Sequence, residues 1–183
     1  MNRLIRPVLT ALTIACAAAS FASVTTDRAM AQQQGGELKQ MAITQKQIDG
    51  AIAAQKDMEA LTAKMQPNAK PDPKVLAQIE ATAKKNGFAS TDEYYTVMDN
   101  ISLVYGGIDP ATKKYVGSEA VIKSQIAEVT ADKKMSANDK KQALEQLNQA
   151  LKQPEPAVQN KGNIDLVVSN FDKLAPVMNE DQQ

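Results

Sequence analysis

Residues 87–108 read GFASTDEYYTVMDNISLVYGGI, the densest apolar stretch that follows the N-terminal leader. Its apolar side chains recur every three or four residues, at Tyr94, Val97, Met98, Ile101, Val104 and Tyr105. This spacing places them on one face of an α-helix and fits no strand alternation. We therefore expect a buried central helix, around which the rest of the chain packs.

The two ends of this helix carry local signals. Ser90 and Glu93 have the spacing of a capping box, in which each side chain bonds an N–H group of the other residue. Gly106 and Gly107 follow the apolar run directly. We expect them to close the helix in the left-handed conformation that glycine adopts easily, with Ile108 folding back on it.

Residues 1–31 have the features of a secretory signal peptide. Two arginines precede an uncharged stretch over residues 7–24, and Ala29-Met30-Ala31 supplies small residues for a cleavage site. We expect cleavage after Ala31, which would place the protein in the periplasm or the medium with no stable membrane insertion. The alternatives are a membrane anchor, for which the apolar run is short, and a lipoprotein modified at Cys16.

Composition excludes several classes of function for the expected mature chain. All three arginines and the single cysteine lie in residues 1–31, and the chain has no His and no Trp. Of 21 basic and 21 acidic residues, removal of three Arg and Asp27 leaves 18 and 20, a net charge of −2. Nucleic acid binding needs a clustered basic surface, so we expect no such partner.

The lack of His and Cys also bears on catalysis. The common nucleophile–base pairs and zinc ligand sets need these residues. Carboxylate pairs remain possible among Asp92, Glu93, Asp99 and Asp109, but acidic residues at helix starts more often serve as caps and dipole partners. We therefore expect no enzyme, no catalytic residue, no metal site and no cofactor.

The order of helical signals predicts an all-α fold. We expect residues 43–178 to form a single helical-bundle-like domain of five main helices plus a short connector helix. Thr44 with Gln47 predicts one capping box, and Asp72-Pro73 predicts another helix start. Asp109-Pro110 predicts the connector, and Asn163 is expected to cap the last helix, which runs to Met178. Residues 32–42 should form a flexible tether, and residues 179–183 should fray.

Tyr95 lies about 100° from the apolar stripe of the central helix, on the side that it shares with Asp99 and Ser102. We expect these three residues to form the edge of a groove that binds a partner. The alternative is that another helix covers the Tyr95 ring.

Residues 43–47 read Ile-Thr-Gln-Lys-Gln. This segment resembles the Leu-Thr-x-x-Gln motif of small helical periplasmic stress chaperones of the Spy type. The chain has one copy, with Ile in place of Leu, and its mature part lacks the arginines of that family. The capping box accounts for the same residues, so we do not assign the chain to that family.

The leading functional prediction is a non-enzymatic binding, chaperone-like or adaptor protein. Its partner would be a periplasmic protein or a client polypeptide, bound in a groove beside the central helix. The second hypothesis is a carrier of a small apolar ligand between the helices. The third is an enzyme that uses only carboxylate, Lys, Tyr or Ser groups. The sequence leaves the oligomeric state open.

Overall fold

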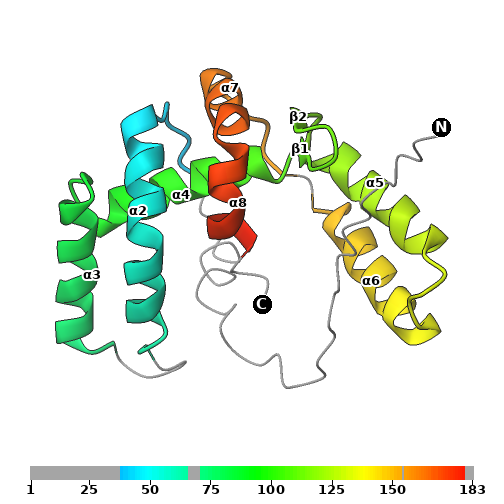
Figure 1. Cartoon of the computed structure of the whole chain (residues 1–183), viewed down its shortest axis with the longest axis horizontal. Helices are drawn as coiled ribbons and strands as arrows, with labels where there is room; N and C mark the ends of the chain where they lie inside the picture. Colours follow the sequence, from blue (N-terminus) through cyan, green and yellow to red (C-terminus); the bar gives the residue numbers. More distant parts are fainter. Residues whose placement is uncertain (1–37, 66–70, 154, 180–183) are drawn as a thin grey trace, which may run out of the picture.

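The computed structural model describes residues 38–65, 71–153 and 155–179, and this part of the chain is mainly helical (Figure 1). The elements in chain order are α2 (Gln45–Thr62), α3 (Pro73–Lys85), α4 (Thr91–Tyr105), β1 (Ile108–Asp109), β2 (Lys114–Tyr115), α5 (Ser118–Ala131), α6 (Ala137–Ala150), α7 (Gly162–Ser169) and α8 (Phe171–Asn179). The all-α prediction is confirmed at this level, with one small antiparallel β1–β2 pair added. The predicted signal peptide lies outside the described residues.

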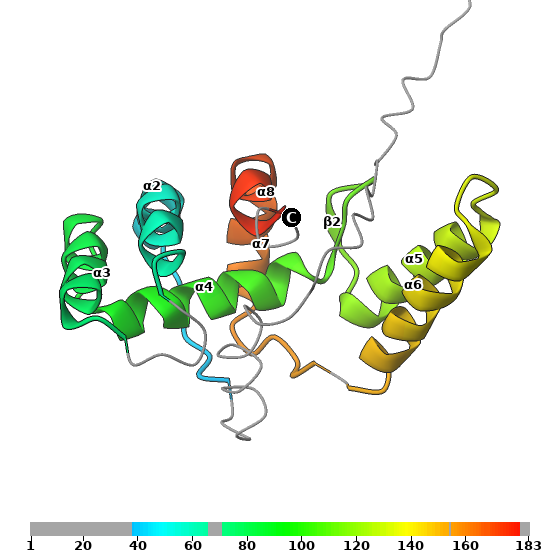
Figure 2. The same cartoon turned by 90° about the horizontal axis from the view of Figure 1, so that it is seen from below.

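The expected central helix is α4, and its apolar stripe is buried. The side chains of Val97, Ile101 and Val104 have no exposed surface, and Tyr94 and Met98 are each 2% exposed. Helices α3, α2 and α8 lie side by side across one face of α4 (Figure 1, Figure 2). The core therefore forms where α2, α3 and α7 meet α4, and α8 adds to it by packing on α2 and α7.

The start of α4 differs in one detail from a capping box. The Ser90 hydroxyl accepts from the Glu93 backbone N–H at 3.1 Å, as predicted. The Glu93 carboxylate, however, accepts from the N–H of Ala89 at 2.6 Å, one residue before the cap. The bond to the Glu93 side chain is thus made one residue earlier than in a capping box, and it fixes the turn that enters the helix.

The end of α4 contradicts the prediction of left-handed glycines. Gly106 has φ −61° and ψ −19°, which is right-handed, and Gly107 is not among the positive-φ glycines of the described residues. Glycine is needed at 107 for space, because a Cβ there would collide with the ring of Tyr115. The N–H groups of Val116 and Gly117 both donate to the Gly107 carbonyl, at 2.8 and 3.0 Å, so the returning chain closes this end.

The expected connector helix is a β-hairpin instead. The Asp109 carboxylate accepts from the N–H groups of Ala111 and Thr112 at 2.8 and 3.2 Å, as a helix cap would. The turn does not continue into a helix, because Lys113 has a positive φ of 54°. The chain then returns as β2, with Tyr115 paired to Ile108.

The start of α2 and its contact with α3 follow the sequence signals. Thr44 and Gln47 form the predicted capping box, and the Asp72 side chain caps α3. Gly50 lets the two helices approach, because a Cβ at this position would collide with the Asn86 carbonyl and lie 3.3 Å from Phe88. Phe88, 3% exposed, fills the corner before α4.

The expected last helix consists of two helices, α7 and α8. The Asn170 amide donates to the Leu166 carbonyl at 2.8 Å, and the Asn170 backbone N–H turns to Val167 at 3.1 Å. The Asn170 side chain thus takes the Leu166 carbonyl that its own backbone N–H would bond in a continuous helix, and the helical hydrogen bonding is interrupted. Asn163 does not act as the predicted cap, since α7 starts at Gly162 with Lys161 as N-cap and no side-chain cap bond.

Helices α5 and α6 form the expected antiparallel pair, which we call the α5–α6 hairpin. It projects from the β1–β2 end of the molecule, away from the layer of α2, α3 and α8 (Figure 1, Figure 2). Val121 is the one buried residue among those of α5, and α6, described over its whole length, has none. The α5–α6 hairpin therefore lies beside the packed layer rather than within it, because the β-hairpin turns the chain away from α4.

Candidate functional site

The three predicted binding residues lie on α4 at helical spacing. Tyr95 is half-buried against the core, and its ring meets that of Tyr94 edge-to-face at 5.3 Å. Asp99 is exposed and Ser102 is half-buried. None of the three lines the hollow beside β2 and α5 or the hollow between α2 and α3. Their role in binding stays a prediction.

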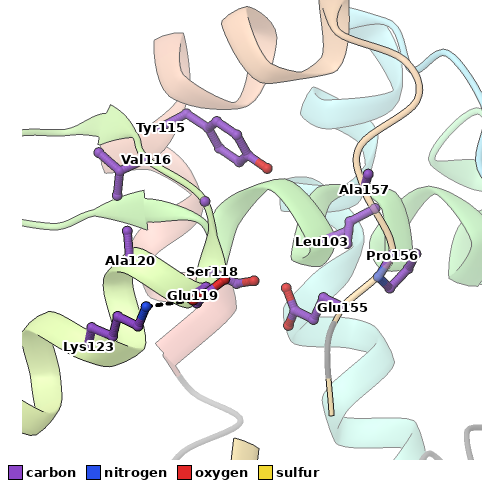
Figure 3. Close-up of a pocket in the computed structure, with 11 residues that line it drawn as sticks. Leu103, Tyr115, Val116, Ser118, Glu119, Ala120, Lys123, Glu155, Pro156 and Ala157 are labelled. Atoms are coloured by element: carbon purple, nitrogen blue, oxygen red, sulfur yellow. Dashed lines mark hydrogen bonds and ion pairs between the residues drawn. The ribbon is translucent and has the colours of Figure 1, made fainter. Parts of the chain in front are cut away.

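One hollow of about 400 Å³ lies where α4, β2 and the start of α5 meet the segment after α6 (Figure 3). Its lining residues are Leu103, Tyr115, Val116, Gly117, Ser118, Glu119, Ala120, Lys123, Glu155, Pro156 and Ala157. A second hollow of about 420 Å³ lies between α2 and α3. Both are open to solvent.

Charged groups of the first hollow are largely engaged with one another. Glu119 and Lys123 form an ion pair at 2.6 Å, and this bond lowers the pKa of Glu119. Burial, followed by the nearby Glu155 carboxylate, raises the pKa of Tyr115. Such a mixed lining suits the rim of a protein contact better than a site for an apolar ligand.

Two buried asparagines, Asn100 and Asn163, form a more specific arrangement, which holds the N-terminal arm (residues 38–43) on the domain. Asn100 on α4 accepts from the Met41 N–H at 3.0 Å and donates to the Lys39 carbonyl at 2.9 Å. Asn163 accepts from the Ile43 N–H at 3.0 Å and donates to the Met41 carbonyl at 2.8 Å. The expected flexible tether is thus wrong for residues 38–42, while residues 32–37 lie outside the described part.

Further contacts add to this attachment, one within the arm at Gln40 and one just after it at Gln45, in α2. Gln40 donates to the Ala157 carbonyl at 2.9 Å and accepts from the Gln159 N–H at 2.8 Å. Asn170 exchanges amide bonds with Gln45 at 2.8 and 3.0 Å. The arm therefore joins α4, α7 and the segment after α6 through polar bonds.

Asn100 and Asn170 were not identified from the sequence, although a signal for both was present. Asn100 lies in helical phase with the buried Val97 and Val104, and Asn170 lies in phase with Val167 and Leu174. A polar residue within an apolar stripe must find a bonding partner when it is buried. The sequence pattern could show that need, but not the partner.

The α5–α6 hairpin carries the other candidate surface. Its inward apolar residues are each half-buried, and we call them the hairpin seam: Ile122, Ile126, Val129, Leu144, Leu147 and Leu151. Each helix of the hairpin buries only the part of the seam that faces the other helix. Two helices alone therefore leave the rest of the seam in contact with water. The seam is therefore half-covered apolar surface on a projecting element.

In the described part of the chain, no three acidic, His or Cys side chains gather closely enough to hold a metal ion. Across residues 38–65, 71–153 and 155–179, no helix combines the length and apolar character needed to cross a membrane. Comparisons with protein families, with curated proteins and with solved structures found no match to this chain.

Proposed function

We propose that this is a non-enzymatic binding protein of the periplasm or medium that docks another protein surface on its α5–α6 hairpin. In this proposal the layer of α2, α3, α8 and α4 is a rigid support. The hairpin is the element that reaches the partner, in the manner of an adaptor.

The observation that supports the proposal is the unequal burial of the two halves of the molecule. Ile48, Val97, Ile101, Val167 and Leu174 have no exposed surface. By contrast, every side chain of the hairpin seam keeps part of its surface in water. A partner helix laid along the seam would remove that surface from water, at about 25 cal/mol for each Å² buried.

Export is part of the proposal and rests on the leader sequence alone. If residues 1–31 are removed, the mature protein begins at Gln32, six residues before the arm. The intact mass of protein recovered from its own host will decide this point. A lipid-modified species that begins at Cys16 would contradict a freely diffusing binding protein.

Native mass spectrometry tests the binding role. Protein isolated from its host should retain a macromolecule, and Leu147→Glu in the seam should lose it. Gln146→Glu is the matched control, since it adds the same charge to an exposed neighbouring residue. A retained small apolar molecule, unaffected by Leu147→Glu, would instead support the ligand-carrier hypothesis.

A further inference from the structure

The exposed charges of the α5–α6 hairpin are unevenly distributed along its length. Near the tip, where α5 turns into α6, Lys133, Lys134 and Lys141 are exposed against Glu128 alone. At the base, next to the β-hairpin, the exposed charges are those of Glu119, Glu145, Glu155, Lys123 and Lys152. When the half-buried Asp132, Asp139 and Lys140 are counted as well, the tip is positive by one charge, and the base is negative by one.

The remaining charged groups of the tip are used within the hairpin. Lys140 donates to the Asp132 and Thr130 carbonyls at 2.6 and 3.0 Å, which closes the end of α5. Asp139 accepts from the Ser136 hydroxyl at 2.7 Å at the start of α6. These groups hold the turn and leave the exposed lysines to face a partner.

We propose that the partner of the hairpin seam is a second copy of this chain, bound antiparallel so that two hairpins form a four-helix bundle. The inference rests on the proposed function, because it names the partner of that same surface. A two-fold axis across the middle of the hairpin lays each positive tip beside the negative base of the other copy. The same operation brings the two seams face to face, as an isologous contact requires.

The shape of the molecule favours the antiparallel arrangement over the parallel one. Each hairpin helix has 14 residues and is about 21 Å long. Figure 2 shows that the support lies at the base of the hairpin. An antiparallel arrangement would therefore place the two supports at opposite ends of the bundle. In a parallel arrangement the exposed lysines of the two tips would meet, and like charges would repel.

Sedimentation of the full mature protein tests whether the copies associate. We expect a dimer in the micromolar range that weakens by about tenfold or more in Leu147→Glu. Gln146→Glu should remain dimeric, and circular dichroism will show whether each variant keeps its helices. A wild-type protein that stays monomeric throughout this range overturns the inference.

Engineered cysteines test the direction of packing independently of seam variants. The mature sequence contains no cysteine, so Lys134→Cys and Lys152→Cys each introduce a single thiol. Both sites are exposed, one at the tip and one at the base. When the two variants are mixed and oxidised, a disulfide should form between them. Lys134→Cys alone should cross-link poorly, and efficient self-linking at this site overturns the antiparallel arrangement.

The two proposals can fail separately. A monomeric protein that still loses a different bound protein in Leu147→Glu contradicts the second-copy inference and leaves the binding role intact. If Leu147→Glu changes neither self-association nor capture of another protein, the seam has no docking role, and both proposals are wrong.

Discussion

Asn100 binds the main chain on both sides of Gln40, because its side-chain oxygen accepts from the Met41 N–H and its amide nitrogen donates to the Lys39 carbonyl. Asn100 is 1% exposed and lies 59 residues from Met41 in the chain. A single buried amide therefore ties the N-terminal arm to the central helix.

The first prediction follows from this contact. Asn100→Ala should lower the free energy of unfolding by about 1 to 3 kcal/mol, since it leaves main-chain groups of the arm without their partner. Amide hydrogen exchange should show faster exchange at Met41. Asn148→Ala, at an exposed asparagine of α6, is the control and should be close to neutral. Equal exchange at Met41 in both variants would contradict the role given to Asn100.

The second prediction concerns the core stripe of α4. Ile101 has no exposed surface, so Ile101→Asp would bury an unpaired carboxylate at a cost of several kcal/mol, comparable with the stability of a domain of this size. We expect it to unfold the domain, whereas the half-buried Ser102→Asp should be tolerated. Chemical denaturation compares the two, and equal midpoints would show that the stripe is wrongly placed.

The helices that the sequence predicted are those whose signals are local. The α4 stripe, the Thr44–Gln47 box and the Asp72 cap need only neighbouring residues, and all three are present. Asn163 was misread as a cap because its bonding partner, Ile43, lies 120 residues away. Gly107 was misread for a similar reason, since the ring of Tyr115 across the β-hairpin, rather than a left-handed turn, requires glycine there.

The candidate surface was predicted even less completely. The leucine spacing of α6 showed that one face is apolar, but it could not show that, among the described elements, this helix packs mainly against α5. That depends on the direction in which the chain leaves α4, which the Lys113 turn sets. The position of Tyr95 beside the stripe was correct, yet helical phase could not show that its ring rests on Tyr94.

The third prediction is the pH dependence of stability. Glu80 accepts from the backbone N–H and the hydroxyl of Thr91 at 2.9 and 2.7 Å. These bonds, followed by the one to Lys84, lower its pKa from 4.5 to about 2. A group with a lowered folded-state pKa stabilises the fold above its unfolded-state pKa, so this contribution should be lost as pH falls from 4.5 toward 2.

Denaturation midpoints measured across pH will test this. Glu80→Gln should reduce the fall of the denaturation midpoint as pH drops below 4.5. Glu59→Gln, on the exposed side of α2, is the control and should leave this pH dependence unchanged. Burial raises the pKa values of Tyr105 and Tyr115 above 10, so their contribution is lost only at higher pH. Stability should therefore be flat from about pH 5.5 to 8.5. A marked slope in that window would support the enzyme hypothesis.

The fourth prediction separates Tyr95 from Tyr94. Tyr94 is 2% exposed and donates to Gln55 at 3.2 Å, so Tyr94→Ala should cost about 3 to 5 kcal/mol. Tyr95 is half-buried, and Tyr95→Ala should cost about 1 kcal/mol or slightly more, chiefly from the lost ring contact. Thermal unfolding of both variants checks this. Equal losses would make Tyr95 a core residue and remove it as a binding candidate.

The fifth prediction tests the central claim that the hairpin seam is the docking surface. A photoreactive phenylalanine derivative placed at Leu144, in the seam, should cross-link to another protein chain when the protein is irradiated in its host. The same residue at Gln142, which is exposed on α6 outside the seam, should give far less product. Mass analysis of the adduct will show whether the captured chain is a second copy or a different protein. Equal yields from the two positions, or no adduct from Leu144, would contradict the account.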